Sequence, residues 1–370
     1  MNVREAIAGK RILITGGTGT IGREVVRRLL PLGPRVVRIY SRDETKHFYL
    51  QDQLRQHANV RFLIGDVRDR ERLRMAMAEI DVVFHLAAMK HVEGSEYNPF
   101  EAIKTNIVGT QNVVETALDA NVASVVLTST DKAVNPSNAM GASKLMAEKL
   151  MVAANYYKGK RRTVFSGIRF GNVLGSSGSV VPTFIARIRN GEAIEVTHPE
   201  MTRFITSYSQ AVELLMVALM CAQGGEIFLR KMPVIRILDL AEVLVREMSS
   251  LYGHDGVEVR ITGVRAGEKT AEELFTLEES TRTVAVGEYY VVKPQIGIAA
   301  PIEGDARPVP ARAYSSADQT PLSPAEILAM FYQDHVFTQH HGANGSLGRD
   351  FEINPQFAQK PDVDFYGAVV

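Results

Sequence analysis

Two adjacent residues, Asp131 and Lys132, place an acid beside a base in this chain of 370 residues. They follow the apolar and β-branched run Val125–Ser129, so we expect them at the end of a strand. A carboxyl group there could protonate a departing oxygen, and an amine could remove a proton from carbon while it is neutral. Such a pair suits the elimination of water. The alternative is a solvated loop pair.

The two roles set conditions on each other. Asp131 can act as an acid only if it holds its proton, and an ammonium group beside it would favour the carboxylate. Both roles are therefore compatible only if Lys132 is neutral. A neutral lysine requires burial or a neighbouring cation such as Lys144.

Met140 and Lys144 lie four residues apart in a segment with helical periodicity, and hence on one face of a helix. A Met side chain cannot accept a proton. If the chemistry includes deprotonation of a hydroxyl group, that step falls to Thr130, to Asp131 or to a bound water. All three remain candidates.

A glycine-rich turn lies near the start of the chain. Gly16, Gly19 and Gly22 follow the apolar run Arg11–Thr15 and open a helical pattern. In such a turn, backbone N–H groups and the positive end of a helix can face a pyrophosphate. We therefore predict that a dinucleotide binds here, and the predicted contacts in the turn are Gly16, Thr18, Gly19, Thr20, Ile21 and Gly22.

The end of the second predicted strand bears on the choice between NAD and NADP. Ser41, Arg42 and Lys46 could surround a 2′-phosphate, with Arg42 offering a bidentate fork. Asp43 complicates this choice, and it could instead cap the next helix. We favour NADP over NAD. At the end of the third strand, Asp66 could accept a hydrogen bond from the adenine amino group or cap the following helix.

Alternating strand and helix patterns must position these residues. The predicted strands are Arg11–Thr15, Val36–Tyr40, Val60–Ile64, Val82–Ala87, Val125–Ser129 and Val164–Phe170. Predicted helices between them include Ile21–Leu32, Asp69–Ala78, Pro99–Ala120 and Met140–Tyr157. Apolar strands separated by helices indicate an α/β fold with a doubly wound parallel (Rossmann) sheet, which binds ligands at the carboxyl ends of its strands.

The pattern becomes less regular after Phe170. We predict an NADP-binding domain over 1–172 to which later segments return, a mainly substrate-binding lobe over 173–300, and an extension of unknown role over 301–370. Further predicted elements are helices Thr183–Asn190, Ala211–Ala222 (opened by a capping box from Ser207 to Gln210) and Leu238–Leu251, and strands Ile194–Thr197 and Val257–Thr262.

Composition excludes several classes of protein. Lys+Arg and Asp+Glu both total 42, so no net charge attracts nucleic acid or an anionic membrane. The N-terminus lacks a signal peptide and no apolar run reaches about 20 residues, which predicts a cytoplasmic protein without membrane contact. No His, Cys or Asp cluster has metal-ligand spacing, so no metal is predicted. Cys221, within the apolar run Leu214–Ala222, is predicted to be a buried structural thiol.

Together these motifs resemble the extended short-chain dehydrogenase/reductase family, and more narrowly the nucleotide-sugar 4,6-dehydratases that act on UDP-N-acetylglucosamine. The resemblance runs from about residue 11 to residue 275. Some relatives carry membrane-spanning N-terminal regions, whereas this chain resembles the soluble form. The matching segments are the glycine turn, Ser41–Glu44, Gly65–Asp69, Leu86–Val92, Asn98–Ala102, Thr105–Thr110, Ser129–Ala133, Met140–Lys144, Arg169–Val173, His198–Phe204 and Gly267–Lys269.

The resemblance implies oxidation of the sugar at C4 with bound NADP⁺, loss of water across C5–C6 and return of the hydride to C6. It implies that Lys144 holds the nicotinamide ribose and that Met140 replaces a catalytic Tyr, as in many members of the narrower group. Asp131 is then the candidate acid for the C6 oxygen and Lys132 the candidate base for the C5 proton.

Further contacts are expected from their places in these motifs. Arg203 and Arg265 are candidates for the diphosphate, while His91 and His198 could also be structural histidines. The additional cofactor contacts predicted are Val67, Leu86, Ala87, Ala88 and Asn106, and the substrate contacts are Lys90, His91, Asn172, Arg203, Arg265 and Glu268.

Two other functions remain open. An epimerase on the same fold would use the same cofactor but needs the Tyr that Met140 replaces, and a non-catalytic NADP-binding sensor would need neither Asp131 nor Lys132. We also expect a homodimer or higher homo-oligomer, because relatives pair the corresponding helices between subunits as a four-helix bundle. The apolar residues expected there are Ile103, Ile107, Val113, Leu145, Leu150 and Met151.

Overall fold

The computed structural model describes residues 2–176, 178–296, 305–334, 336–339 and 351–353. The chain divides into two compact units. The first comprises Met1–Gly171, Tyr208–Lys231 and Glu273–Ser315, and the second comprises Asn172–Ser207, Met232–Glu272 and Ser316–Val370. The functional labels attached to 1–172, 173–300 and 301–370 remain predictions, and the end of the last range lies outside the described residues.

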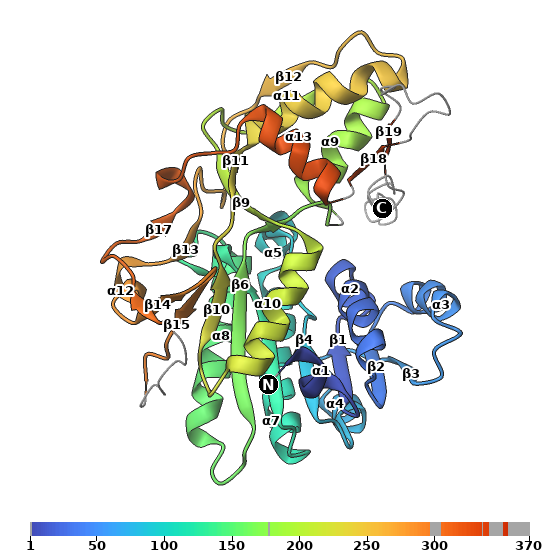
Figure 1. The fold of residues 1–370 in the computed structure, drawn as a ribbon, viewed down its shortest axis with the longest axis vertical. Coiled ribbons are helices and arrows are strands. Elements are labelled where there is room, and N and C mark those ends of the chain that lie inside the picture. Colours follow the sequence, from blue (N-terminus) through green and yellow to red (C-terminus); the bar gives the residue numbers. More distant parts are fainter. Residues whose placement is uncertain (1, 177, 297–304, 335, 340–350, 354–370) are drawn as a thin grey trace. The chain divides into compact units, whose positions relative to one another are not determined.

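Among the described residues, the first unit contains a ten-stranded sheet in the order β16-β14-β15-β10-β6-β5-β4-β1-β2-β3 (Figure 1). From β3 to β10 the neighbouring strands are parallel, and the last three are antiparallel. This confirms the predicted α/β fold with a doubly wound parallel sheet. The strands are β1 (Arg11–Thr15), β2 (Val36–Ser41), β3 (Val60–Ile64), β4 (Val82–His85), β5 (Ser124–Thr130), β6 (Val164–Phe170), β10 (Ile227–Arg230), β14 (Thr283–Val286), β15 (Tyr289–Val292) and β16 (Arg307–Pro308).

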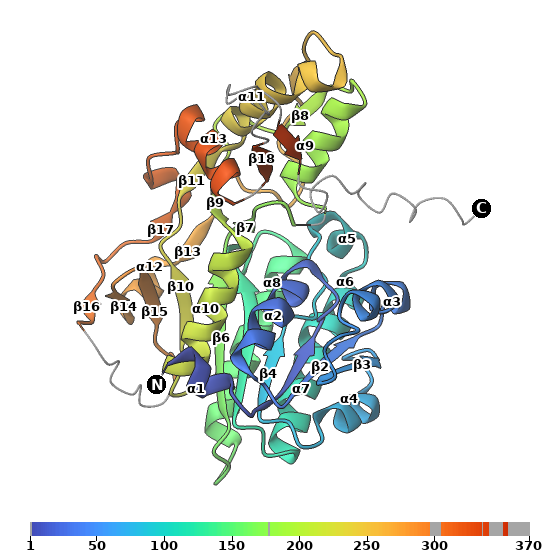
Figure 2. The same ribbon diagram turned by 45° about the vertical axis from the view of Figure 1, so that its right-hand side comes forward.

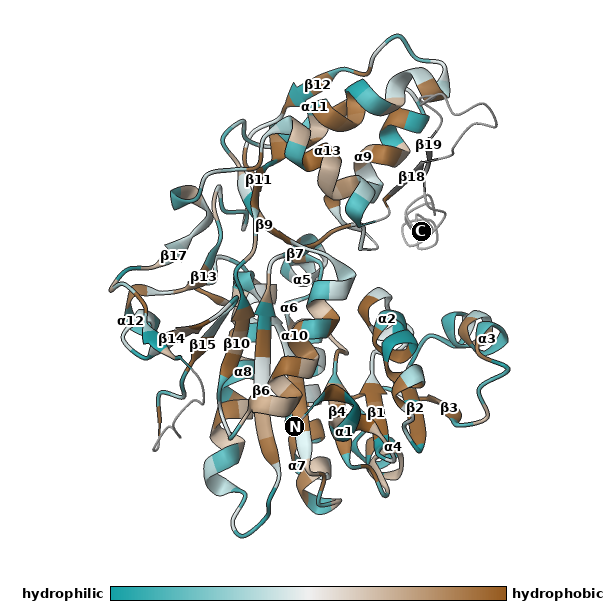
Figure 3. Ribbon diagram, in the orientation of Figure 1, coloured by the Kyte–Doolittle hydropathy of each residue, from teal (hydrophilic) through white to brown (hydrophobic). Residues whose placement is uncertain are grey.

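Helices cover both faces of this sheet (Figures 1 and 2). Successive residues of β1 enter opposite cores: Ile12 and Ile14 pack with α2 and α10, whereas Leu13 packs with α4, α7 and α8. Because successive side chains alternate across a strand and enter two cores, the central strands are mainly apolar on both faces, as the brown colour of most of their length in Figure 3 shows. The helices are α2 (Thr20–Leu29), α4 (Arg70–Met77), α7 (Gly109–Asp119), α8 (Ala139–Tyr157) and α10 (Tyr208–Cys221).

The predicted helix Pro99–Ala120 is present as one helical run, but its hydrogen-bond pattern changes along its length. It consists of α6 (Pro99–Ala102), a π-helical segment (Ile103–Val108) and α7. π-Helical segments often occur at functional sites, and this one carries the buried side chain of Asn106. Elements that we did not predict in this unit include α1 (Val3–Ile7), α3 (Glu44–Gln53), α5 (Val92–Tyr97), α12 (Leu277–Ser280), β13 (Glu273–Phe275) and β17 (Tyr314–Ser315).

The second unit has smaller sheets. β9 (Thr202–Thr206) lies between β11 (Val234–Arg236) and β7 (Asn172–Val173), and β8 (Ile194–Val196) pairs with β12 (Val259–Ile261). Its helices are α9 (Val180–Arg189), α11 (Ile237–Met248) and α13 (Pro324–Gln333), and β18 (Phe337–Gln339) pairs with β19 (Phe351–Ile353).

Two findings concern the predictions on Cys221 and on membranes. Ala218 is fully buried, but Cys221, the last residue of α10, is exposed. The prediction of a buried thiol is therefore wrong, because the buried face of α10 stops before the helix ends. In the part of the chain that the structure describes, no helix has the length and apolar character needed to cross a bilayer.

Candidate active site

The turn between β1 and α2 packs too closely for side chains. Gly16 has φ +69°, and a Cβ there would lie 2.8 Å from the backbone nitrogen of Ala87. At Gly22 a Cβ would lie 2.6 Å from the Cα of Gly17. Gly19 precedes the first residues of α2, Thr20 and Ile21, and cannot cap their N–H groups with a side chain. The arrangement can hold a pyrophosphate at the start of this helix.

Polar side chains gather at the end of β2. Thr18 Oγ1 and Ser41 Oγ are 2.8 Å apart and share a hydrogen bond. Arg42 lies 3.7 Å from a carboxylate oxygen of Asp66, and its side chain is 61% exposed. Asp43 caps α3, as the alternative interpretation predicted, and its other oxygen lies 3.0 Å from Lys46 Nζ. Arg42 and Lys46 thus each face a carboxylate in the segment that follows β2.

Asp66 does not cap the helix that follows it. Asp69 caps α4 instead, by accepting a hydrogen bond from the backbone N–H of Arg72. The Asp66 carboxylate accepts from the backbone N–H, Nε and Nη2 of Arg68 at 2.9, 2.9 and 2.7 Å. The capping alternative for Asp66 is therefore wrong. The neighbouring Val67 is buried in the core.

Asn106 ties the segment after β4 to α8. Its Oδ1 accepts from the backbone N–H of Met89 at 2.8 Å, and its Nδ2 donates to Met89 O at 3.0 Å and to Ser143 Oγ at 2.8 Å. Asn106, which we predicted to contact the cofactor, thus forms these three hydrogen bonds with other groups of the protein. The half-buried residues Leu86, Ala87 and Ala88 lie between β4 and this anchor.

Sequence reasoning missed His85, the last residue of β4. Its Nδ1 lies 2.7 Å from Thr15 Oγ1 and its Nε2 lies 3.1 Å from Thr110 Oγ1. Thr110 donates its own hydroxyl proton to Asn106 O, so its oxygen accepts from Nε2–H of His85 and Thr15 donates to Nδ1. Burial, assisted by Lys144, lowers the pKa of His85 to about 3. A neutral imidazole therefore links β1 to α7. The polar end of an otherwise apolar strand was the available signal.

The residues at the end of β5 form a short 3₁₀ turn (Asp131–Ala133). Asp131 is fully buried, and its Oδ1 accepts from Thr130 Oγ1 at 2.9 Å and from Lys132 Nζ at 3.0 Å. Its Oδ2 is buried and has no hydrogen-bond partner among the described residues. The alternative of a solvated loop pair is therefore wrong. A buried carboxylate oxygen without a partner calls for an explanation, and a catalytic role is one such explanation.

The first turns of α8 pack against this turn. Met140 and Lys144 are both buried, and Lys144 Nζ donates to Thr128 O at 2.6 Å. Burial lowers the pKa of Lys144 to about 8, and the negative charge of Glu148 partly opposes that shift. A Cβ on Gly141 would lie 2.1 Å from Lys132 O, which shows how closely the two segments meet. The structure therefore brings together the predicted catalytic residues Thr130, Asp131, Lys132, Met140 and Lys144.

Lys90 and His91 follow β4 in the same unit. Loss of solvation and then the ammonium group of Lys46 lower the pKa of Lys90. Burial and then Lys90 lower the pKa of His91. By accessible surface both residues are exposed, so they present basic groups to solvent beyond the carboxyl end of β4, where an anionic ligand would relieve their mutual repulsion.

The other predicted substrate contacts lie in the second unit. Arg203 is buried and donates to Thr202 O and Lys269 O, both at 2.8 Å. Arg265 is exposed, its Nη2 lies 3.4 Å from Glu195 Oε2, and its backbone N–H donates to the side chain of Glu268. Arg265 is therefore the more accessible of the two arginines. Asn172 begins β7, and the Nδ1 atom of His198 accepts from the backbone N–H of Glu200, which supports the structural alternative for His198.

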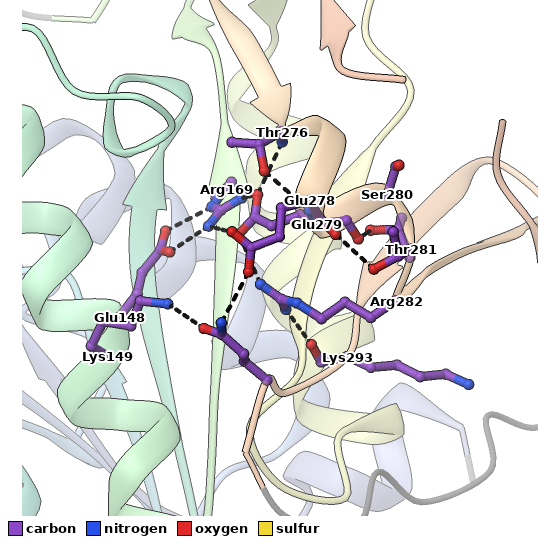
Figure 4. A network of polar contacts seen from close by, with 12 residues as sticks. Glu148, Lys149, Arg169, Thr276, Glu278, Glu279, Ser280, Thr281, Arg282 and Lys293 are labelled. Carbon is purple, nitrogen blue, oxygen red and sulfur yellow. Dashed lines mark hydrogen bonds and ion pairs between the residues drawn. The ribbon is translucent and has the colours of Figure 1, made fainter. Parts of the chain in front are cut away.

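A buried charge network near the end of β6 was also missed (Figure 4). Arg169 donates from Nε and Nη2 to both oxygens of Glu148, at 2.9 and 2.7 Å. It also donates from Nη1 and Nη2 to both oxygens of Glu279, at 2.8 Å each, and from Nη1 to Leu274 O at 3.1 Å. Arg282 Nη2 lies 3.4 Å from Glu279. The network joins β6, α8, β13 and α12.

Comparison with known proteins identifies the family. A family profile described as polysaccharide biosynthesis protein matches residues 12–294. The chain belongs to this family. That match covers the sheet strands β1 to β15 and therefore the whole of the candidate site in the first unit.

Named relatives of the family differ in their reactions. A UDP-N-acetylglucosamine 4,6-dehydratase (inverting) of Campylobacter jejuni is 44% identical over 290 residues, 78% of this chain and 84% of the relative. A UDP-glucose 4-epimerase of Rickettsia typhi is 39% identical over 285 residues, 76% of this chain and 82% of the relative. The X-ray structure of Pen from Bacillus thuringiensis is similar with a TM-score of 0.84 and 42% identity, covering 89% of this chain and 98% of that one.

Proposed function

We propose that this chain is a nucleotide-sugar 4,6-dehydratase that converts UDP-N-acetylglucosamine to a UDP-4-keto-6-deoxy-N-acetylhexosamine. The observation that carries the proposal is the buried carboxylate of Asp131, with one unpaired oxygen, 3.0 Å from Lys132 Nζ at a strand end. Elimination of water needs an acid and a base together, whereas epimerisation at C4 needs no such pair. The 44% identity to a dehydratase adds support.

The residues present fit a dinucleotide, because the glycines at 16 and 22 leave no room for a Cβ and bring the backbone to the start of α2. We propose NADP rather than NAD, since Arg42 and Lys46 follow Ser41 in the segment after β2 and could bind a 2′-phosphate. Lys144 would hold the nicotinamide ribose. Bound there, NADP⁺ would supply the hydride chemistry that oxidation at C4 and reduction at C6 of the sugar require.

The chain's own groups would move the protons. Thr130 Oγ1 donates to Asp131 Oδ1, so the C4 hydroxyl proton can pass through Thr130 to the carboxylate. Asp131 then gives a proton to the departing C6 oxygen. Lys132, which pairs with Asp131 in the resting site, would release its ammonium proton to solvent before it takes the C5 proton, and it would later return that proton to C5. The proton lost at C4 is thus the one that leaves with water. Met140 needs no role as a base in this scheme.

Other groups would bind the sugar nucleotide. Lys90 and His91 lie beyond β4 among basic groups and would contact the sugar. Arg265, exposed in the second unit, would bind the diphosphate with Arg203, positioned by Glu268, and Asn172 would contact a phosphate or the acetamido group. Each of these assignments remains a proposal drawn from the motifs and the charges described above.

The experiment that tests the function is incubation of the purified chain with UDP-N-acetylglucosamine and NADP, followed by mass spectrometry and NMR. Loss of one water supports the dehydratase. An unchanged mass with a new isomer supports the second candidate, an epimerase, which the relative from Rickettsia typhi favours. No change in either measurement favours a non-catalytic sensor.

We further propose that the chain forms a homodimer through α6, the π-helical segment and α8. Exposed apolar residues on these elements include Phe100, Ile103 and Met146. Val113 and Met151, which we expected at this surface, are fully buried in the core of the first unit and cannot line it. A monomer mass by light scattering at micromolar concentration would contradict the proposal.

A further inference from the structure

Lys144 is the end of a line of alternating buried charges. α8 places Glu148 one turn after Lys144, and the line continues through Arg169 and Glu279 to Arg282. Residues four apart on a helix lie on the same face, so the Glu148 carboxylate acts on the Lys144 ammonium across one turn. Lys144, Glu148 and Arg169 are all less than one tenth exposed, so water screens these charges little.

Glu148 cannot swing away from this place. Both of its oxygens accept from Arg169, at 2.9 and 2.7 Å, in the bidentate geometry that fixes both partners. Arg169 is fixed in turn by both oxygens of Glu279 and by Leu274 O. Lys144 Nζ is held from the other side by Thr128 O at 2.6 Å. The Glu148 carboxylate is therefore fixed in position one helical turn from Lys144.

We propose that Glu148 is a positioning residue for Lys144: its fixed charge keeps the buried ammonium group protonated at neutral pH, while Arg169 and Glu279 hold Glu148 in place. The proposal rests on the proposed function only in that Lys144 is the residue assigned to the nicotinamide ribose. Glu148 lies outside the motif Met140–Lys144, and the proposal makes the charge of Lys144 depend on it.

The groups around Lys144 leave Glu148 as its main source of negative charge. His85 on β4 is neutral, because burial and Lys144 itself lower its pKa to about 3. Asp131 and Lys132 lie on the 3₁₀ turn that packs against α8, and they form an ion pair with each other. Burial lowers the pKa of Lys144 from 10.5 to about 8, and Glu148 is the charge that raises it.

The sign of the pH dependence follows. Between pH 8 and pH 10.5 the unfolded chain binds more protons at Lys144 than the folded chain does, so Lys144 makes the unfolding free energy rise with pH over this window. Without the Glu148 charge the folded-state pKa of Lys144 falls further. The rise should then begin about one pH unit lower.

The experiment measures urea unfolding from pH 6 to pH 10.5 for the parent, Glu148→Gln and Glu279→Gln, each with and without Lys144→Met. Subtracting the Lys144→Met series isolates Lys144 from other groups that titrate in this range. Glu279→Gln is the matched control, since it removes a carboxylate from the same guanidinium but not the one that faces Lys144. We expect the Lys144-dependent rise in unfolding free energy to begin near pH 7 in Glu148→Gln. In the parent and in Glu279→Gln it should begin near pH 8.

An unchanged onset in Glu148→Gln, or an equal displacement in Glu279→Gln, would overturn the proposal. If Glu148→Gln does not fold, Glu148→Asp draws the charge back by one methylene and should give an onset between the two values. An onset equal to that of the parent would again contradict it.

A second readout uses the cofactor. A charged ammonium group disfavours the positively charged ring of NADP⁺ relative to NADPH, so the ratio of their dissociation constants should change as Lys144 titrates. In Glu148→Gln this ratio of dissociation constants should change at a lower pH than in the parent. If the parent binds neither cofactor, the proposed function fails, while the unfolding data still decide the role of Glu148.

Discussion

Two neighbouring strands of the sheet end in buried charges, and the two clusters differ in how completely they are paired. Ser129 of β5 lies opposite Arg169 of β6 in the parallel register, so both clusters belong to the same edge of the sheet. Each oxygen of Glu148 and Glu279 accepts from Arg169. Asp131, in the 3₁₀ turn that follows β5, has one oxygen without a partner among the described residues.

The difference separates a structural role from a chemical one. Burial alone does not distinguish the clusters, since Asp131 and Arg169 are equally inaccessible. A fully paired network holds elements together, and breaking it leaves an uncompensated charge. An unpaired buried oxygen destabilises the fold slightly and persists where a ligand completes it. We therefore expect the two clusters to fail in different ways.

The largest effect is expected from Lys132→Ala. Loss of the base should lower the dehydration rate roughly 100- to 10,000-fold, while binding and oxidation at C4 persist. NADPH absorbance should then build up, because the hydride has no unsaturated acceptor. Unfolding free energy should fall less than in a variant of Arg169, because one buried carboxylate, Asp131, loses its cation here, whereas Arg169 serves two. Stopped-flow absorbance and deuterium incorporation at C5 in heavy water check these outcomes.

A matched control for this variant is Lys149→Ala on α8. Lys149 is exposed, and its Nζ donates to Gln295 at 3.1 Å, outside the candidate site. It should keep the parent rate. Parent-rate exchange at C5 in Lys132→Ala would instead assign the base to Asp131 or to an ordered water.

The reverse pattern is expected from Arg169→Leu. This variant leaves two buried carboxylates without their shared cation, so it should lower the unfolding free energy by about 3–5 kcal/mol. Urea titration at pH 7 measures the loss. The Lys132 variant serves as the comparison, and a larger loss of stability there than in Arg169→Leu would reverse our assignment of the two clusters.

An intermediate effect is expected from Gly141→Ala. This variant changes the packing of α8 against the 3₁₀ turn Asp131–Ala133 but leaves the charged side chains of the turn in place. A Cβ there would lie 2.1 Å from Lys132 O, so the turn or α8 must move. We expect a cost of about 1–3 kcal/mol and a lower rate than the parent. Gly94→Ala in α5 is the control, because its Cβ would meet only ordinary contacts. Equal behaviour of the two variants would mean that the close packing at Gly141 does not position Lys132.

Much of the sheet could be predicted from sequence because its strands are apolar runs between clear turns. β1, β3 and β6 have the predicted bounds. The π-helical segment could not be predicted, since an extra residue in the hydrogen-bond ladder barely changes apolar spacing over Pro99–Ala120. α3 was missed because its apolar residues, among them exposed Phe48 and Tyr49, follow no single face.

The site shows the same division between local and distant information. Asp131, Lys132 and Lys144 could be placed because a strand end and a helix start lie near one another in sequence. The partners of Arg169 could not, since Glu279 lies 110 residues away and only the fold brings them together. Asp66 and Cys221 were misjudged for local reasons. Asp69, three residues after Asp66, caps α4 instead, and the buried face of α10 stops at Ala218, before Cys221.

The smallest effect on stability is expected from an exposed ion pair, which contrasts with the two buried clusters. Arg42 and Asp66 lie at the ends of β2 and β3, 3.7 Å apart, and Arg42 is 61% exposed. Exposed pairs add at most about 1 kcal/mol to stability, so Arg42→Ala should leave the unfolding free energy nearly unchanged. If Arg42 faces a 2′-phosphate, the same variant should weaken NADP binding about tenfold and NAD binding hardly at all. Calorimetric titration of both cofactors measures this, with Arg55→Ala at the end of α3 as an exposed control. Equal losses for both cofactors would show that Arg42 does not recognise the 2′-phosphate, and no loss for either would show that, like Arg169, it has a role confined to the protein itself.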